Sequence, residues 1–448
     1  MSHGQNTITG LKKDISFIAA LALVVGMVIG SGIFMKPSVV IAAAGNSTLA
    51  LGAWVIGGII TLAAGLSTAE LGAQIPKTGG LYTYLEEIYG PVLGYLFGWM
   101  QTVIYGPATI AALGLYFATL LLPFFGIMDG GLKMPIAVAA VMLLTLANAL
   151  GSKYGGFIQS VATAGKLIPI ILIAVFGLLM GNGQILGMAS TADSSLPAAG
   201  MGAAILATLW AYDGWIGVSY VAGEMKNPAK QLPKAIIIGL GIVMVAYVAV
   251  NLAVLHLIPA ADIVTLGKQA AGTAAGIMFG DFGGRLINIG ILVSIFGALN
   301  GYILTNSRVP FAMAERGQLP GARWLSEVQP RFGTPVNASL LEMVLAIILV
   351  CLFDPDKLTD IAMFAVWLFY ILAFVAVFIL RRRYPGRSRT YSVPGYPVVP
   401  AIAVIGSVYI IISTVITNTQ DCVWSIILTL VGIPFYLWAR RQGPAIKK

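Results

Sequence analysis

The sequence predicts an all-α integral membrane protein with about twelve transmembrane helices. Hydrophobic residues make up 58% of the 448-residue chain and charged residues only 10%. A soluble domain carries about 25% charged residues, so water cannot be the solvent for most of this surface. Apolar runs of spanning length recur from end to end, and basic residues alternate between successive loops as twelve spans require.

The apolar runs divide into two sets of five spans and a final pair. Residues 15–180 contain the first set, residues 201–380 the second and residues 398–439 the final pair, while 1–14 and 440–448 form terminal tails. Approximate spans, judged by apolar length, are 15–44, 48–72, 91–124, 134–150, 156–180, 201–222, 235–257, 286–312, 336–353, 359–380, 398–416 and 422–439.

Lysine and arginine residues indicate how these spans are oriented. With a cytoplasmic N-terminus, Lys166 lies within a span and 20 of the 26 basic residues lie on the inner side. This bias follows the positive-inside rule and predicts that both termini are cytoplasmic. The charges are dispersed and lack interleaved aromatic residues, which argues against nucleic-acid binding. The five outer basic residues are Lys36, Lys133, Lys268, Arg285 and Lys357.

The first and sixth spans both carry glycine and small polar residues at mid-membrane depth. The first contains Gly26 and then Gly30-Ser31-Gly32, and the sixth contains Ala211-Tyr-Asp-Gly-Trp215. Small residues four apart can simply mark close helix packing. Two interruptions five spans apart instead predict broken helices in two repeats of opposite orientation, which is the sequence pattern of a transporter site.

Broken helices expose backbone groups that can bind charged ligands. The N-terminal ends of half-helices offer N–H groups to a carboxylate, and their C-terminal ends offer carbonyls to an ammonium group. A site with both ends available suits a zwitterion. The two breaks therefore favour an amino acid as the ligand.

Several motifs resemble those of the amino acid–polyamine–organocation superfamily. They are GSGIF at 30–34, AELGAQIPKTGGLYTYL at 69–85, AYDGW at 211–215, GEMKNPAKQLPKAI at 223–236, FGALNG at 296–301 and SRVPFAMAERGQLP at 307–320. The chain looks most like the L-amino acid transporter family within it, and like the bacterial serine/threonine and alanine/serine/cysteine exchangers. The similarity extends over nearly the whole chain.

This resemblance implies a leucine-transporter fold with a five-plus-five inverted repeat and discontinuous helices 1 and 6. It implies sodium-independent exchange of small neutral L-amino acids, such as alanine, serine, cysteine and threonine, by alternating access. Two alternatives stay open: a proton-coupled symporter of neutral amino acids, and an exchanger of cationic amino acids attracted by Asp213.

The resemblance also implies a set of site residues. Gly30, Ser31 and Gly32 would bind the substrate carboxylate, and carbonyls near Ile29 and Ala211 would bind its ammonium group. The remaining implied residues are Trp210 as the outer aromatic gate, Gly214 in the second break, and Ile104 and Thr109 beside the side-chain pocket.

Lys153 is the residue we assign to the transport cycle, with Ser294 as its partner. It opens the fifth span, where a lysine of the family stands in for the cation of sodium-driven relatives. The alternative is a lysine that only extends toward the inner lipid headgroups. Lys166 is predicted to be buried with no identifiable partner. We expect Asp213 to cap the inner half-helix and Glu342 to lie near a span end.

Other functional classes have little support in the sequence. With only His3 and His256, and with Cys351 and Cys422 in or beside apolar runs, neither an enzyme, a metal site nor a cofactor is expected. The loop 126–133 has no cysteine. A disulfide-linked heavy chain, as in eukaryotic relatives, is therefore not expected. That feature and the short termini favour a bacterial inner membrane, with membrane lipid as the other contact.

Overall fold

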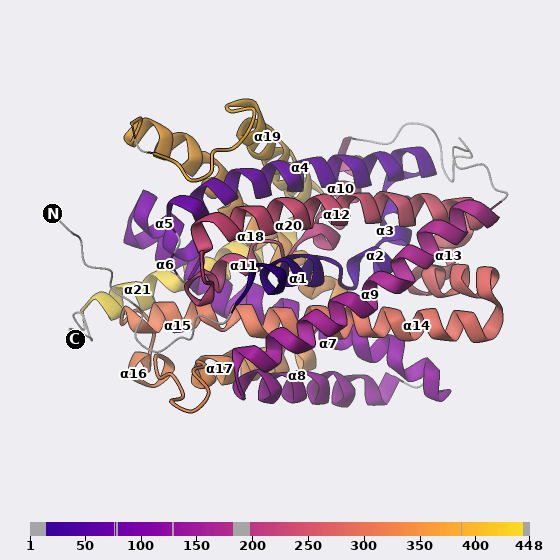
Figure 1. Cartoon of the computed structure of the whole chain (residues 1–448), viewed down its shortest axis with the longest axis horizontal. Coiled ribbons are helices and arrows are strands. Elements are labelled where there is room, and N and C mark those ends of the chain that lie inside the picture. The colour runs from indigo at the N-terminus through magenta and orange to yellow at the C-terminus, as the bar shows by residue number, and fades with distance from the viewer. Residues whose placement is uncertain are drawn as a thin grey trace.

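The computed structural model of this chain is a bundle of long helices that run along its long axis (Figure 1). It describes residues 15–75, 77, 79–127, 130–181, 198–386 and 388–441. Within these residues ten helices are long and apolar enough to cross a membrane, and two shorter apolar helices, Gly200–Tyr212 and Val336–Leu352, complete the twelve predicted spans. The same residues contain no β-strand beyond two isolated bridges.

The first five spans begin with an interrupted helix. Its parts are α1 (Phe17–Val28), α2 (Gly32–Met35) and α3 (Pro37–Ala44). The third span is also irregular, because a π-helical segment, η1 (Gln101–Tyr105), joins its two α-helices. The other elements are α4 (Ser47–Gln74), α5 (Leu81–Tyr89), α6 (Pro91–Met100), α7 (Gly106–Leu121), η2 (Leu122–Phe125), η3 (Gly130–Leu132), α8 (Lys133–Ala149) and α9 (Ser152–Met180).

The next five spans also begin with an interrupted helix. Its parts are α10 (Ala198–Tyr212) and α11 (Gly217–Tyr220). The other elements are η4 (Ala222–Glu224), α12 (Pro228–Leu257), α13 (Ala260–Leu266), η5 (Gly267–Gln269), α14 (Ala270–Asn306), α15 (Arg308–Glu315), α16 (Ala322–Leu325), α17 (Val336–Leu352) and α18 (Pro355–Arg383). The final pair is α19 (Val398–Thr417) and α20 (Thr419–Leu430), with α20 continued by α21 (Gly432–Arg441).

Short-range capping explains where several of these helices begin. The Asn46 side chain accepts a 2.8 Å hydrogen bond from the Leu49 N–H and caps α4. Asp354 accepts bonds from two backbone N–H groups and caps α18, with Pro355 at the first helical position. Both arrangements satisfy backbone donors that a helix start leaves unpaired.

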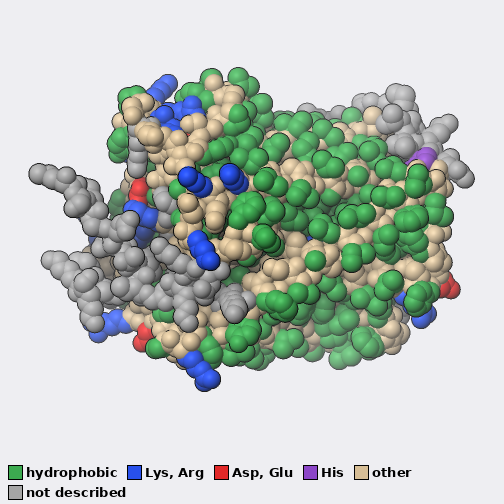
Figure 2. Space-filling view, in the orientation of Figure 1, with side chains coloured by type: hydrophobic (Ala, Val, Ile, Leu, Met, Phe, Trp, Pro, Cys, Tyr) green, Lys and Arg blue, Asp and Glu red, His purple; other side chains and the backbone are tan. Residues whose placement is uncertain are grey.

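The interrupted first span lies in the centre of the bundle. α1 contacts α9, α12, α14 and α11, so it is enclosed by helices from both sets of five (Figure 1). Apolar side chains cover the middle of the face in Figure 2, and most of the basic side chains visible there lie toward one end. We call this the basic end; it carries α5, α15, α16 and α21 (Figure 1). The opposite end carries α3 and α13.

Candidate functional site

The first break leaves polar groups without partners in the interior. α1 ends at Val28, and the chain is not helical again until Gly32. In the described part of the chain, the N–H groups of Ser31 and Gly32 have no backbone acceptor, and the Ser31 hydroxyl has no hydrogen-bond partner. Ser31 is only 1% exposed. Unpaired buried donors that open a helix are a suitable site for a carboxylate.

The second break lies directly against the first. A β-carbon built on Gly32 would fall 2.3 Å from the Ala211 Cα, so the two backbones touch and only glycine fits at this position. Gly214 has a φ of +105°, and a β-carbon there would lie 3.1 Å from the Met27 β-carbon. The predicted residues Gly32, Ala211 and Gly214 are therefore together in space.

Lys166 reaches the first break. The Lys166 ammonium group donates 2.6 Å hydrogen bonds to the carbonyls of Gly26 and Ile29, and its side chain is fully buried. Ser294 donates to the Ile29 and Gly30 carbonyls at 3.2 and 3.4 Å. The prediction paired Ser294 with Lys153, which stands thirteen residues earlier in α9, about 20 Å along the helix. The side chain of Lys153 lies outside the described residues.

The break explains why these carbonyls can accept bonds from side chains. In an unbroken helix the Gly26 carbonyl would bind the N–H of residue 30, but the Gly30 N–H donates to Val28 instead. The Lys166 ammonium group takes the place of that lost donor. A charge at this depth is costly unless it is paired or bonded to carbonyls, and here it has two.

The second predicted ammonium-binding carbonyl is also occupied. The Tyr247 hydroxyl lies 2.8 Å from the Ala211 carbonyl and 2.6 Å from the Val28 carbonyl, so its one hydrogen is shared between the two breaks. Tyr247 is fully buried on α12. No pattern in the sequence singles out this tyrosine, since one tyrosine in an apolar helix is typical of any core position.

Asp213 does not cap the inner half-helix as predicted. Its carboxylate accepts hydrogen bonds from the hydroxyls of Tyr105, Tyr302 at 3.2 Å and Tyr370 at 3.3 Å. The N-cap of α11 is Ile216. The three tyrosines come from the third, eighth and tenth spans, so this carboxylate ties the second break to three other helices.

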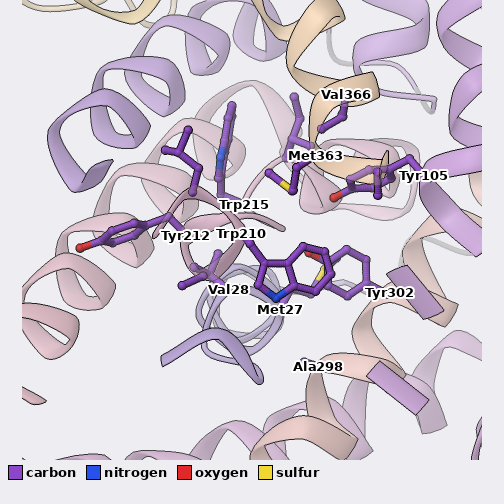
Figure 3. Packing of buried hydrophobic residues seen from close by; sticks show 14 of the residues in the cluster. Met27, Val28, Tyr105, Trp210, Tyr212, Trp215, Ala298, Tyr302, Met363 and Val366 are labelled. Atoms are coloured by element: carbon purple, nitrogen blue, oxygen red, sulfur yellow. The ribbon is translucent and has the colours of Figure 1, made fainter. Parts of the chain in front are cut away.

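The remaining predicted residues lie in the surrounding core. Trp210 is 8% exposed, Ile104 3% and Thr109 fully buried. The Thr109 hydroxyl donates to the Tyr105 carbonyl at 2.7 Å, which leaves its methyl group for apolar contacts. Figure 3 shows Trp210, Tyr212 and Trp215 around the second break with their rings pointing in different directions.

Ion pairs close both ends of the bundle. At the basic end Arg308 binds Glu224 at 2.9 Å, with 2% and 1% of the two side chains exposed. The Glu224 carbonyl also accepts a bond from the Ile15 N–H, next to the start of α1. At the opposite end Asp356 binds Lys36 at 3.5 Å and Lys268 at 2.8 Å.

The prediction for Glu342 is wrong. This residue is 2% exposed rather than interfacial, and neither carboxyl oxygen has a hydrogen-bond partner in the described structure. A β-carbon on Gly106 would lie 2.6 Å from Glu342 Oε2, so the carboxyl faces the start of α7. Within the described segments no group of three or more His, Cys, Asp or Glu residues could hold a metal ion.

Comparisons with known proteins agree with this architecture. The model of the family described as amino acid permease matches residues 15–436. The serine/threonine exchanger SteT of Bacillus subtilis is 52% identical over 433 residues, covering 97% of this chain and 98% of that protein. The human cystine/glutamate transporter is 31% identical over 434 residues, covering 95% and 85%. The mouse Asc-type amino acid transporter 1 is 30% identical over 434 residues, covering 95% and 81%.

Proposed function

Since the chain belongs to the amino acid permease family, we propose that this membrane transporter of amino acids is a sodium-independent exchanger of small neutral L-amino acids. Alanine, serine, cysteine and threonine are the expected substrates. The similarity to an exchanger named for serine and threonine supports the size and polarity of this set.

The observation that carries the proposal is the Lys166 ammonium group on the first break. It bonds to two carbonyls that a broken helix exposes, which are the groups that coordinate a sodium ion in broken-helix transporters. A covalently attached cation occupies this position in every turnover. A sodium ion is then not needed to close the break around substrate.

Substrate binding uses the polar groups left free at the breaks. The carboxylate binds the N–H groups of Ser31 and Gly32 and the Ser31 hydroxyl, with Gly30 allowing the close approach. The ammonium group of the substrate competes with the Tyr247 hydroxyl for the Ala211 carbonyl and lies near Ile29. Trp210 closes over the bound amino acid, and Ile104 and the Thr109 methyl group leave room for a small side chain.

The charges favour a neutral side chain over a cationic one. Asp213 is the only acidic residue between the half-helices α10 and α11, and three tyrosine hydroxyls already bind its carboxylate. A cationic substrate would have to replace these donors. This contact pattern argues against the alternative of a cationic amino acid exchanger.

Alternating access then opens one end of the bundle at a time. We assign the basic end, where α15 and α16 lie, to the cytoplasm, because basic residues concentrate on that side in membrane proteins. Both termini are then cytoplasmic. We also expect the protein to act without a disulfide-linked partner, in the plasma membrane of a bacterium.

Uptake of labelled L-serine into liposomes of the purified protein tests this proposal. In sodium-free buffer, we expect uptake only into vesicles preloaded with a small neutral amino acid. Equal uptake into empty vesicles would overturn exchange and favour proton symport, which a pH gradient would then stimulate. Uptake that needs sodium would overturn the role given to Lys166. Arginine in place of internal serine tests the cationic alternative.

A further inference from the structure

A second polar site lies beside the π-helical segment of the third span, separate from the two breaks. Its members are Glu342 of α17, Gln101 of η1 and Asn306 at the end of α14, all buried. A β-carbon on Gly106 would lie 2.6 Å from Glu342 Oε2, 2.8 Å from the Gln101 carbonyl and 3.3 Å from Asn306 Nδ2. Two neighbouring spans therefore direct polar side chains at this glycine, whose own N–H bonds to the Gln101 carbonyl.

In this cluster the unpaired hydrogen-bond acceptors outnumber the unpaired donors. Gln101 Nε2 donates to Asn306 Oδ1 at 3.4 Å, which is the one side-chain bond within the cluster. Three acceptors have no partner among the described residues: Gln101 Oε1 and both oxygens of Glu342. Only one donor, Asn306 Nδ2, is also unpaired. What the site lacks is a hydrogen that can be donated.

The charge of the site also indicates that a proton is missing. An ionised carboxylate in the membrane interior is costly without a cation, and no described basic residue forms an ion pair with Glu342. A proton on Glu342 removes this charge and converts one unpaired acceptor into a donor. One oxygen of the neutral acid can then donate, and Gln101 Oε1 is an acceptor of the cluster that has no other partner among the described residues.

Other titratable groups on the neighbouring helices are engaged elsewhere or are not buried. Tyr105 and Tyr302 bind Asp213, Tyr116 binds Asp356 and Arg308 binds Glu224. None of the described titratable residues on elements packed against α17 donates to Glu342. The full set is Tyr105 on η1, Tyr116 on α7, Lys133 on α8, Asp281, Arg285 and Tyr302 on α14, Arg308 and Glu315 on α15, and Arg323 on α16.

The π-helical segment links this cluster to the substrate site. Tyr105, its last residue, binds Asp213 in the second break, and Gly106, the next residue, faces Glu342. Single π-helical turns inside α-helices occur often at functional sites. A change at Glu342 therefore acts on the backbone that positions a tyrosine of the second break.

We propose that Glu342 is a proton-binding site that makes the rate of exchange depend on pH. The proton comes from water and returns to it: a carboxylate and a hydronium ion give the carboxylic acid and water. The closed conformation holds the neutral acid. Raising the pH removes the proton and leaves a buried carboxylate against the π-helical segment. This disfavours the closed state, through which every exchange cycle passes.

Infrared spectroscopy of the purified protein tests proton binding without any transport. The wild type at neutral pH should show a carbonyl band of a neutral carboxylic acid that is missing in Glu342→Gln. Asp281→Asn, at an exposed carboxylate of α14, is the matched control and should leave that band unchanged. Identical spectra of the wild type and Glu342→Gln in this region would overturn the proposal.

Exchange assays test the functional consequence, and only they rest on the proposed function. Wild-type exchange should slow as the buffer is made alkaline, whereas Glu342→Gln, which keeps a neutral donor, should exchange at a rate that does not follow pH. Glu342→Ala should lower the rate by about tenfold, since it removes the group that would donate to the unpaired Gln101 oxygen. A flat wild-type profile, or the same slope in both proteins, would overturn the pH dependence. Wild-type protein that shows the band but no exchange would instead refute the proposed function.

Discussion

Replacement of Lys166 by methionine separates a functional lysine from a structural one. Methionine keeps the length of the side chain but donates no hydrogen bond. The Ile29 carbonyl keeps its 3.2 Å bond from Ser294, so only the Gly26 carbonyl loses its sole side-chain donor among the described residues. One buried carbonyl without a partner costs about 1–3 kcal/mol. We expect the exchange rate to fall by about 5- to 150-fold if that cost is incurred on the way to the transition state.

The stability of the same variant should change much less than its activity. The substitution also removes a charge that is buried without a counter-ion, and the cost of burying that charge offsets part of the lost hydrogen bonding. The thermal unfolding midpoint in detergent should therefore stay close to that of the wild type. Lower activity at unchanged stability would assign Lys166 to the transport cycle.

The assay is initial-rate exchange of labelled L-serine in proteoliposomes, measured over a range of external serine concentrations. Lys166→Met should lower the maximal rate more than it raises KM, because the lysine bonds to the break and not to the substrate. Lys153→Ala, on the same helix, is the matched control and should exchange normally. Exchange within about twofold of wild type for Lys166→Met, a difference below one typical hydrogen bond, would refute this reasoning. An equal loss in Lys153→Ala would restore the original assignment.

Three further predictions concern the two breaks. Ser294→Ala removes bonds of 3.2 and 3.4 Å and should slow serine exchange by about 2- to 10-fold, a loss typical of one weak hydrogen bond; an unchanged rate would contradict it. Gly30→Ala places a methyl group 2.9 Å from the Ala298 β-carbon and should abolish exchange, while the double variant with Ala298→Gly should recover it; no recovery would show that the contact is not the cause. The Asp213 carboxylate only accepts hydrogen bonds, and it accepts them from three tyrosine hydroxyls, whereas the amide of Asp213→Asn also donates. This variant should lower serine exchange by about tenfold, as expected for one mismatched bond to a charged group. It should not transport arginine.

The sequence was sufficient to predict the spans and the breaks. The length of an apolar run can be compared directly with the thickness of the membrane, so the spans are predictable. Glycines at mid-membrane depth indicate where the helical hydrogen bonding is interrupted. Gly26 has the packing role that small residues usually have: a β-carbon there would lie 2.1 Å from the Gln159 side chain on α9. The break itself begins only after Val28.

The contact between Lys166 and the first break was not predicted from the sequence. Thirteen residues at 100° each place Lys153 and Lys166 about 220° apart around α9, on nearly opposite faces. A usable signal was present, since Gln159, Thr163 and Lys166 recur at intervals of four and three residues on one face. All three are buried, and Thr163 donates to the Ala22 carbonyl of α1. Polar periodicity identifies the face of α9 that packs on the broken helix.

Contacts among side chains far apart in the sequence could not be predicted. No residue near Asp213 in the sequence predicts contacts with three tyrosines from three other spans. A carboxylate in a break is equally compatible with a helix cap. Glu342 stands seven residues into its helix, where hydropathy alone cannot distinguish a buried carboxyl from an interfacial one. Its environment follows from the π-helical segment of another span, which no local propensity predicted.

The two closed ends of the bundle differ in what it costs to open them, and this difference bears on exchange. Arg308 and Glu224 are almost fully buried, so opening the basic end has to separate a hydrogen-bonded ion pair that water does not screen. Asp356, at the opposite end, has 47% of its side chain exposed, so water screens its pairs with Lys36 and Lys268 more than it screens the pair at the basic end. The empty carrier should therefore open readily at the opposite end and rarely at the basic end. Opening at the basic end then requires binding energy from an amino acid at the breaks, which is the physical condition for exchange without net flow.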